Sequence, residues 1–159
     1  MTEAKKAFLQ NDLIFLMNKL SGDEKANWGK MNAQQMIEHV SAFFKVSTQK
    51  IQFPLTTPVE HLPKYKEFLL SEKEFRENTK APVLPEEPLP LRYSNMQEAL
   101  EKLKKSVEEF FEFFKKDPDK KTLHPAFGDL NFDEWVQLHH KHITHHLKQF
   151  GLIDNSIPA

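Results

Sequence analysis

Residues 131–151 read NFDEWVQLHHKHITHHLKQFG. Asn131 followed three residues later by Glu134 is the pattern of a capping box, which predicts that a helix begins here. Gly151 is the residue type expected just after the end of that helix. Five of the eight histidines of the chain lie between residues 139 and 146. The last helix is therefore expected to carry the chemistry of the protein.

The histidines of this helix divide between two faces. When His142 is placed at zero on a helical wheel, His146 lies at about 40° and His139 at about 60°, on the side of the large apolar residues. His140 lies at about 160° and His145 at about 300°, so both are expected to face solvent. The apolar, inward side of the helix is thus also its histidine side.

A shared metal ion is one explanation for inward histidines. His142 and His146 are one turn apart, and this i, i+4 spacing lets two imidazoles bind one ion. A second predicted helix offers His39 on its apolar face, between Met36 and Phe43. Three buried imidazoles would cost several kcal/mol to desolvate without partners. The alternative is that each is an ordinary hydrogen-bonded core residue.

The rest of the pattern favours an all-α fold, a four-helix bundle forming one domain over residues 1–159. Helical periodicity and capping residues indicate long helices at 2–20, from Asn32 to about 48–52, from Ser94 to about 116, and 131–150. The stretch 53–93 holds seven of the ten prolines and is expected to form a long crossover between helices two and three. Within it, 63–77 could form one short helix.

Composition excludes several classes of function. The chain has 159 residues, with 22 basic and 23 acidic side chains, so no electrostatic footprint for nucleic acid is present. It has no cysteine, so any metal must be held by nitrogen and oxygen. No signal-peptide run and no membrane span are apparent, which predicts a cytoplasmic protein without a membrane partner. A monomer or a homodimer is expected.

Three segments resemble the DinB-like superfamily of bacterial four-helix metal-binding proteins. They are WGKMNAQQMIEH at 28–39, HPAFG at 124–128, and 135–151 with its H-x-x-x-H and following glutamine. The H-P-x-F-G segment is similar to an uncharacterised branch of that group. The resemblance implies that His39, His142 and His146 form a three-histidine site, and that a long connection joins the second and third helices.

Relatives of that fold include thiol-cofactor-dependent transferases and a mycothiol-dependent maleylpyruvate isomerase, so the resemblance implies a site more readily than a reaction. A zincin peptidase is disfavoured, because Ile143 stands where H-E-x-x-H carries its glutamate. The first hypothesis is an enzyme that uses a divalent metal ion to act on an unidentified small molecule by hydrolysis, isomerisation or thiol transfer. Zinc is the first choice of metal, and nickel and ferrous iron are the alternatives.

His139 and His124 are candidates for proton transfer or for hydrogen bonding to a ligand residue, and His139 is also an alternative ligand. His124 could instead only hold its loop. Glu38 and His61 are expected on the surface. The second hypothesis is a non-catalytic module, a stress-related or scaffold bundle in which the metal is structural.

Overall fold

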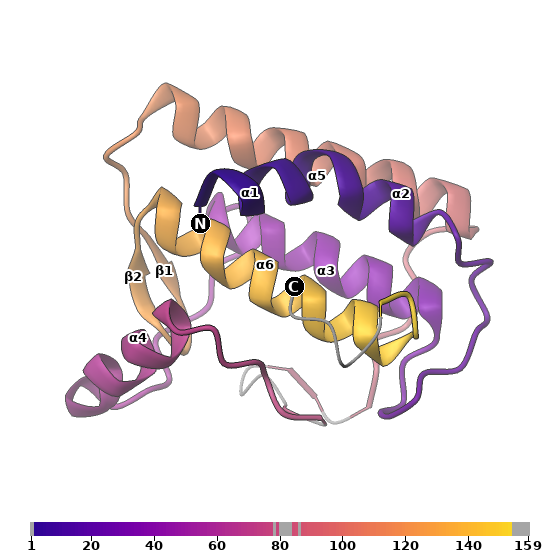
Figure 1. Ribbon diagram of the computed structural model, residues 1–159, viewed down its shortest axis with the longest axis horizontal. Coiled ribbons are helices and arrows are strands. Elements are labelled where there is room, and N and C mark those ends of the chain that lie inside the picture. Colours follow the sequence, from indigo (N-terminus) through magenta and orange to yellow (C-terminus); the bar gives the residue numbers. More distant parts are fainter. Residues whose placement is uncertain (1, 78, 80–83, 86, 154–159) are drawn as a thin grey trace.

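The computed structural model describes residues 2–77, 79, 84–85 and 87–153. The protein is mostly helical, with a small two-stranded sheet (Figure 1). Its elements, in chain order, are α1 Thr2–Ala7, the π-helical turn η1 Phe8–Asp12, α2 Leu13–Met17, α3 Ala33–Ser47, the 3₁₀ turn η2 Val59–His61, α4 Leu62–Leu70, α5 Met96–Lys116, β1 Thr122–His124, β2 Gly128–Leu130 and α6 Phe132–Gln149. Within the described part of the chain, no helix combines the length and the apolarity that a membrane crossing requires.

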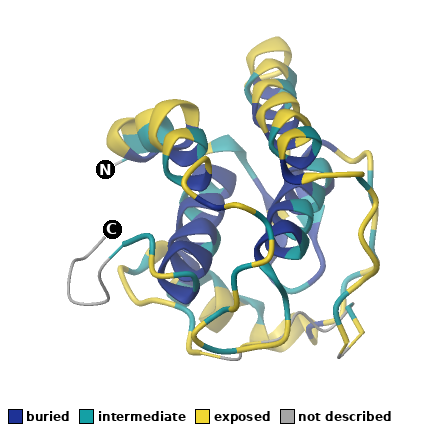
Figure 2. Ribbon diagram, turned by 90° about the vertical axis from the view of Figure 1, so that its right-hand side faces the viewer, coloured by how far each residue is buried: buried dark blue, intermediate teal, exposed yellow. Residues whose placement is uncertain are grey.

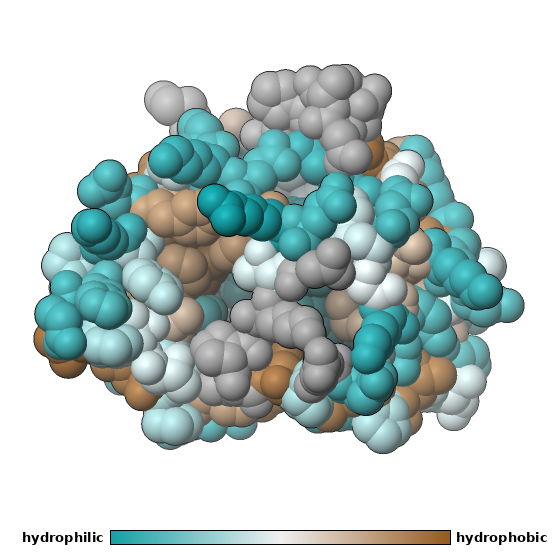
Figure 3. Space-filling view, turned by 90° about the horizontal axis from the view of Figure 1, so that it is seen from below, coloured by the Kyte–Doolittle hydropathy of each residue, from teal (hydrophilic) through white to brown (hydrophobic). Residues whose placement is uncertain are grey.

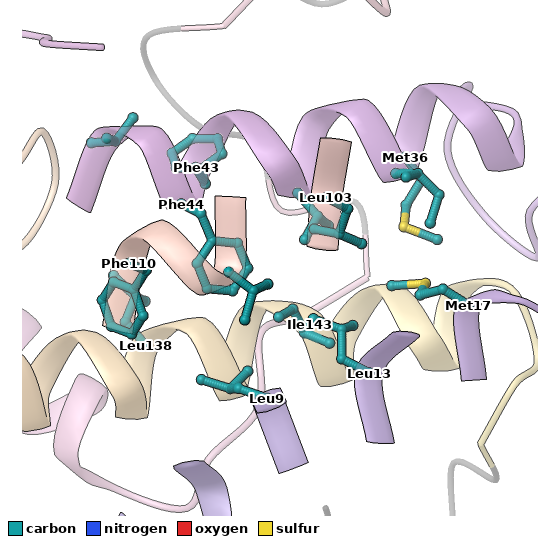
Figure 4. Packing of buried hydrophobic residues seen from close by; sticks show 14 of the residues in the cluster. Leu9, Leu13, Met17, Met36, Phe43, Phe44, Leu103, Phe110, Leu138 and Ile143 are labelled. Carbon is teal, nitrogen blue, oxygen red and sulfur yellow. The ribbon is translucent and has the colours of Figure 1, made fainter. Parts of the chain in front are cut away.

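The N-terminal helical segment, α3, α5 and α6 run lengthwise beside one another (Figure 1). α3 packs on α5, and α1 packs on α6. Between them, Leu9, Leu13, Ile143, Leu103 and Phe110 meet in the core (Figure 4), and each of these side chains is fully buried. Burial of this apolar surface supplies the main driving force for packing the helices together.

Capping boxes begin α3 and α6, the helices that contain His39 and His142. The side chain of Asn32 accepts a hydrogen bond from Gln35 N at 2.8 Å, and Gln35 Oε1 accepts one from Asn32 N at 2.9 Å. Asn131 and Glu134 make the same reciprocal pair at the start of α6. Both starts agree with the sequence pattern. α5 is capped one residue later than expected, by Asn95.

Two expected helices differ from the observed ones, and a third expected element is described only in part. The helix expected over 2–20 ends at Met17 and contains the π-helical turn. The short helix expected over 63–77 is α4, which ends at Leu70 because Ser71 leaves the helical conformation. The crossover expected over 53–93 includes residues 78, 80–83 and 86, which lie outside the described residues.

A β-hairpin corrects the all-α expectation. β1 and β2 pair antiparallel, with Thr122 opposite Leu130 and His124 opposite Gly128. Gly128 has a φ of 82°, a left-handed conformation that glycine adopts without strain and that suits the end of a three-residue hairpin loop. Strands of three residues are too short to show a period of two, so the sequence pattern did not indicate them.

The burial of α6 corrects a second expectation. Thirteen of its 18 residues are buried, and its ribbon is largely dark blue in Figure 2. His140 packs against Phe8 from the N-terminal segment, with ring centroids 5.1 Å apart. His145 lies against the rings of Trp28 and Phe75, with centroids 5.5 and 6.0 Å away. Neither histidine faces solvent, because other parts of the chain cover the side of α6 that turns away from α3.

Candidate metal centre

Two helices bring three histidines to one point. His39 lies in the middle of α3, and His142 and His146 lie one turn apart on α6. The Nε2 atom of His142 is 3.0 Å from the Nε2 atom of His39 and 3.0 Å from that of His146. The ligand atoms of all three residues lie within 4.8 Å of one another. The structure therefore brings together the three residues that the sequence singled out as ligands.

Hydrogen bonding cannot satisfy both of these contacts. Nε2 of a neutral imidazole carries either one hydrogen or one lone pair, so at most one of the two 3.0 Å contacts of His142 can be a linear hydrogen bond of full strength. A tetrahedral ion with bonds of 2.0–2.1 Å would hold its ligand nitrogens about 3.3 Å apart. The two 3.0 Å distances from His142 are close to that spacing, and all three ligand atoms lie within 4.8 Å of one another. The group could therefore hold a divalent metal ion.

A glutamine sets the orientation of His146. Nδ1 of His146 donates to Oε1 of Gln149 at 2.6 Å, which leaves the Nε2 lone pair directed at the site. Nε2 of Gln149 donates in turn to the carbonyl of Trp28 at 2.8 Å. Sequence reasoning did not select Gln149 as a site residue, although its spacing of three from His146 places it within reach on the same helix.

Gly29 makes room for this glutamine. It has a φ of 81°, and a Cβ atom built there would lie 2.9 Å from Nε2 of Gln149. The loop is held against the end of α6 by Asn27 N, which donates to the carbonyl of Gln149 at 2.8 Å. A side chain at position 29 would push the amide away from Trp28 and would thereby disturb His146.

Burial keeps the three histidines in the form that binds metal. Desolvation lowers the pKa of His39 to about 4, and repulsion from His145 adds to the shift. Desolvation also lowers the pKa values of His142 and His146 well below the ordinary 6.5, with further repulsion from neighbouring histidines. All three imidazoles are therefore neutral near pH 7, and metal binding need not displace protons from them.

His139 lies beside the site but bonds elsewhere. Its ring stacks on Phe44, with centroids 4.0 Å apart, and on Trp135. Its Nε2 atom is 3.0 Å from Oγ of Ser47. Because the Ser47 hydroxyl donates to the carbonyl of Phe44 at 2.6 Å, its oxygen accepts from His139, and that Nε2 carries a hydrogen. The three-histidine group does not include His139.

His124 ends strand β1 and holds the hairpin loop. Its Nδ1 atom accepts hydrogen bonds from Ala126 N at 2.9 Å and from Phe127 N at 3.3 Å. Its ring faces that of Phe43, which also contacts His39 and His142. Desolvation lowers the pKa of His124 to about 3. The loop-holding role that the sequence allowed is present, and the residue also lines the space beside the ligands.

A cavity of about 780 Å³ lies over the three histidines. His39, His142, His146, His124 and His139 all contribute to its lining. The surface is hollowed on this side of the molecule (Figure 3), which is the side of α4 and of the connection that leads to α5. This volume is in the range of small-molecule sites in proteins. The nitrogen atoms of the site are therefore adjacent to space that a ligand can fill.

Glu38 is not the free surface residue that the helical wheel predicts. Its carboxylate accepts hydrogen bonds from Arg92 N at 2.8 Å, from Tyr93 N at 3.3 Å and from Gln34 Nε2 at 3.0 Å. It thus fastens the chain before α5 to the first turns of α3, next to the cavity. His61 is exposed, as expected.

The sequence matches one family of known sequences over residues 11–151, a family described as a protein of unknown function (DUF1569). The matched range includes all three ligand candidates as well as Gln149 and His124. No curated protein and no solved structure gave a significant match.

Proposed function

The chain belongs to the DUF1569 family, and we propose that it is a metal-dependent enzyme that holds a divalent ion through His39, His142 and His146. The observation that carries this proposal is the convergence of three neutral Nε2 atoms beside a cavity of small-molecule size. Zinc is the first choice, and nickel and ferrous iron also suit imidazole ligands.

A bound ion would supply Lewis-acid chemistry and would lower the pKa of a water molecule or of another ligand in its open position. The residues around the ion would have different roles. The three imidazoles hold the ion, and Gln149 fixes the tautomer and the orientation of His146. Phe43 packs against two of the ligand rings and limits the access of water to them.

The proposal includes a fold assignment. The N-terminal helical segment, α3, α5 and α6 would form a four-helix bundle of DinB-like type, with the proline-rich stretch 53–93 as its long crossover. Support comes from the lengthwise alignment of these helices (Figure 1) and from ligands on the second and fourth long helical segments. The substrate would be a small molecule that undergoes hydrolysis, isomerisation or thiol transfer.

The alternative is a non-catalytic bundle in which the metal only ties α3 to α6. A structural site has a fourth protein ligand, whereas a catalytic site keeps one position open. Within the described residues, the group contains three histidines and no further ligand. The cavity beside it gives an exchangeable ligand room to enter. These two features favour the enzyme over the structural tie.

Alanine variants test the ligand set. His39→Ala and His142→Ala should each reduce zinc affinity at least tenfold, because each removes one of three ligands. His140→Ala is the matched control, since His140 lies on the same helix but packs against Phe8 outside the group. Affinity is measured by competition with a chromophoric chelator, after melting curves have shown that each variant folds. Full zinc occupancy in a His39→Ala, His142→Ala double variant would end the proposal.

A further inference from the structure

The cavity over the histidines is lined largely by apolar side chains. Phe43 and Val46 of α3, Ile51 and Phe53 of the following connection, and Leu138 of α6 are among its walls. Water in such a space makes few hydrogen bonds, so an apolar molecule of matching size gains free energy by displacing it. The body of the ligand that fits this space is therefore apolar.

The charged groups around the cavity favour a ligand that is also anionic. Two acidic side chains occur among the described lining residues, and both are engaged: Glu38 binds backbone N–H groups, and Glu87 lies 2.8 Å from Nζ of Lys30. Histidine binds a metal ion as a neutral imidazole, so the three ligands would bring no charge of their own. A divalent ion held by them would therefore keep its full charge beside apolar walls, where Coulomb attraction for an anion is strong.

His124 adds a hydrogen-bond donor to the same cavity. Because Nδ1 accepts two backbone hydrogen bonds, the ring hydrogen resides on Nε2. Among the described residues, this Nε2 atom has no hydrogen-bond partner. The ring of Phe43 lies 6.1 Å from that of His124 and 5.2 Å from that of His142, measured between centroids. His124 is therefore about one aromatic ring removed from the ligand histidines.

We propose, resting on the metal site argued above, that the cavity binds a small apolar anion whose acidic oxygen faces His39, His142 and His146, while the Nε2–H of His124 donates to an acceptor at its other end. His124 is then a positioning and specificity residue and not a proton-transfer group. Its low pKa keeps the ring neutral over the physiological range, so its Nε2–H group acts towards the ligand only as a donor.

The test uses three probes of nearly equal shape on the zinc-loaded protein, with binding measured by calorimetry. 4-Acetylbenzoate has the anion and the distal acceptor, 4-isopropylbenzoate has only the anion, and 4-isopropylbenzamide has neither. We expect 4-acetylbenzoate to bind about fivefold more tightly than 4-isopropylbenzoate, the usual gain from one neutral hydrogen bond. The amide should bind at least tenfold more weakly than 4-isopropylbenzoate, and zinc-free protein should lose the preference for the anion.

Two variants isolate the donor. In His124→Asn, the side-chain oxygen can still accept from Ala126 N and Phe127 N, as asparagine does in turns, but the Nε2–H group is lost. The fivefold preference for the acetyl probe should disappear, with zinc affinity unchanged. His124→Gln offers a longer amide donor and should restore part of the preference.

The outcomes distinguish the role of His124, the anionic ligand and the metal site from one another. Equal binding of both benzoates to the wild type, or a preference retained in His124→Asn, would overturn the role of His124. Equal binding of the amide and 4-isopropylbenzoate would overturn the assignment of an anionic ligand. The same anion preference without zinc would overturn the placement of the acidic oxygen at the metal. Failure of the proposed function itself would appear earlier, in a zinc titration without any probe, as absence of binding.

Discussion

Gln149 joins three parts of the chain beside the candidate metal site. Its Oε1 atom accepts from Nδ1 of His146, and its Nε2 atom donates to the carbonyl of Trp28 beside Gly29. A residue that hydrogen-bonds a ligand in this way restricts both the tautomer and the rotation of the ligand ring. The contribution of Gln149 to metal affinity is therefore indirect, and it can be measured without touching a ligand.

Replacing Gln149 by leucine removes both hydrogen bonds and keeps a side chain of similar length. We expect zinc affinity to fall by roughly tenfold, because His146 loses the partner that orients it. Gln149→Glu keeps an acceptor for His146 and should lose less. Gln52→Leu, at an exposed position, is the control. If Gln149→Leu binds zinc as tightly as the wild type, Gln149 has no part in orienting the ligand.

The convergence of His39, His142 and His146 agrees with the sequence pattern, while the surroundings of the other histidines were not predictable from it. Helical periodicity alone places His142 and His146 on one face, because residues four apart are neighbours on the surface of a helix. The burial of His140 and His145 depends on Phe8, Trp28 and Phe75, which come from distant parts of the sequence. A helical wheel describes one helix and carries no information about such contacts.

Among the elements, those with local end signals were predicted best. The capping boxes at Asn32 and Asn131 act within four residues, so the sequence shows them directly. The end of α5 before Asp117 also follows from the proline at position 118. These signals place the two helices that carry the ligands.

The elements that were missed depend on nonlocal contacts or are very short. The hairpin of β1 and β2 packs against α3, and Thr122 Oγ1 donates to the carbonyl of Ser47 at 2.8 Å. The turn between the strands also receives the connection after α3, since Thr56 N donates to the carbonyl of Pro125 at 2.8 Å. These hydrogen bonds join residues that are far apart in the sequence, so local sequence patterns do not predict them.

At the scale of the whole molecule, the connection between α3 and α5 is fastened to both ligand-bearing helices. Lys148 of α6 pairs with Glu74 at 2.6 Å, and Lys5 of the neighbouring α1 pairs with Glu72 at 3.1 Å. Lys141 donates to the carbonyls of Ser71 and Lys73. Near α3, Glu38 binds the backbone at 92–93. The cavity is thus bounded by a connection that is anchored on either side of the site.

Buried histidines also give the metal-free protein a defined acid sensitivity. Desolvation lowers the pKa of His39 to about 4 and those of His124 and His139 to about 3, whereas histidines in the unfolded chain titrate near 6.5. The unfolded state therefore takes up protons first as pH falls. The contribution of these neutral histidines to the free energy of unfolding is fully present above about pH 6.5. It is lost progressively as pH falls towards 4 and below.

Melting curves recorded in a chelator between pH 8 and pH 4 test this expectation. The midpoint should be nearly constant from pH 8 to pH 7 and should fall increasingly below pH 6.5. His139→Phe should flatten that fall, because one buried histidine no longer contributes to it. A midpoint that stays constant down to pH 4.5 would show that these histidines are not buried in neutral form.

X-ray absorption on the cobalt-loaded protein, without and with azide, tests the three-histidine site with an open position most directly. A three-histidine site with an open position would give three imidazole nitrogens at about 2.0–2.1 Å and one further light-atom ligand that azide replaces. Loss of an imidazole shell in His142→Ala would assign the signal to this site. Four protein ligands that do not change on addition of azide would contradict the open position, and fewer than three imidazoles would contradict the site itself.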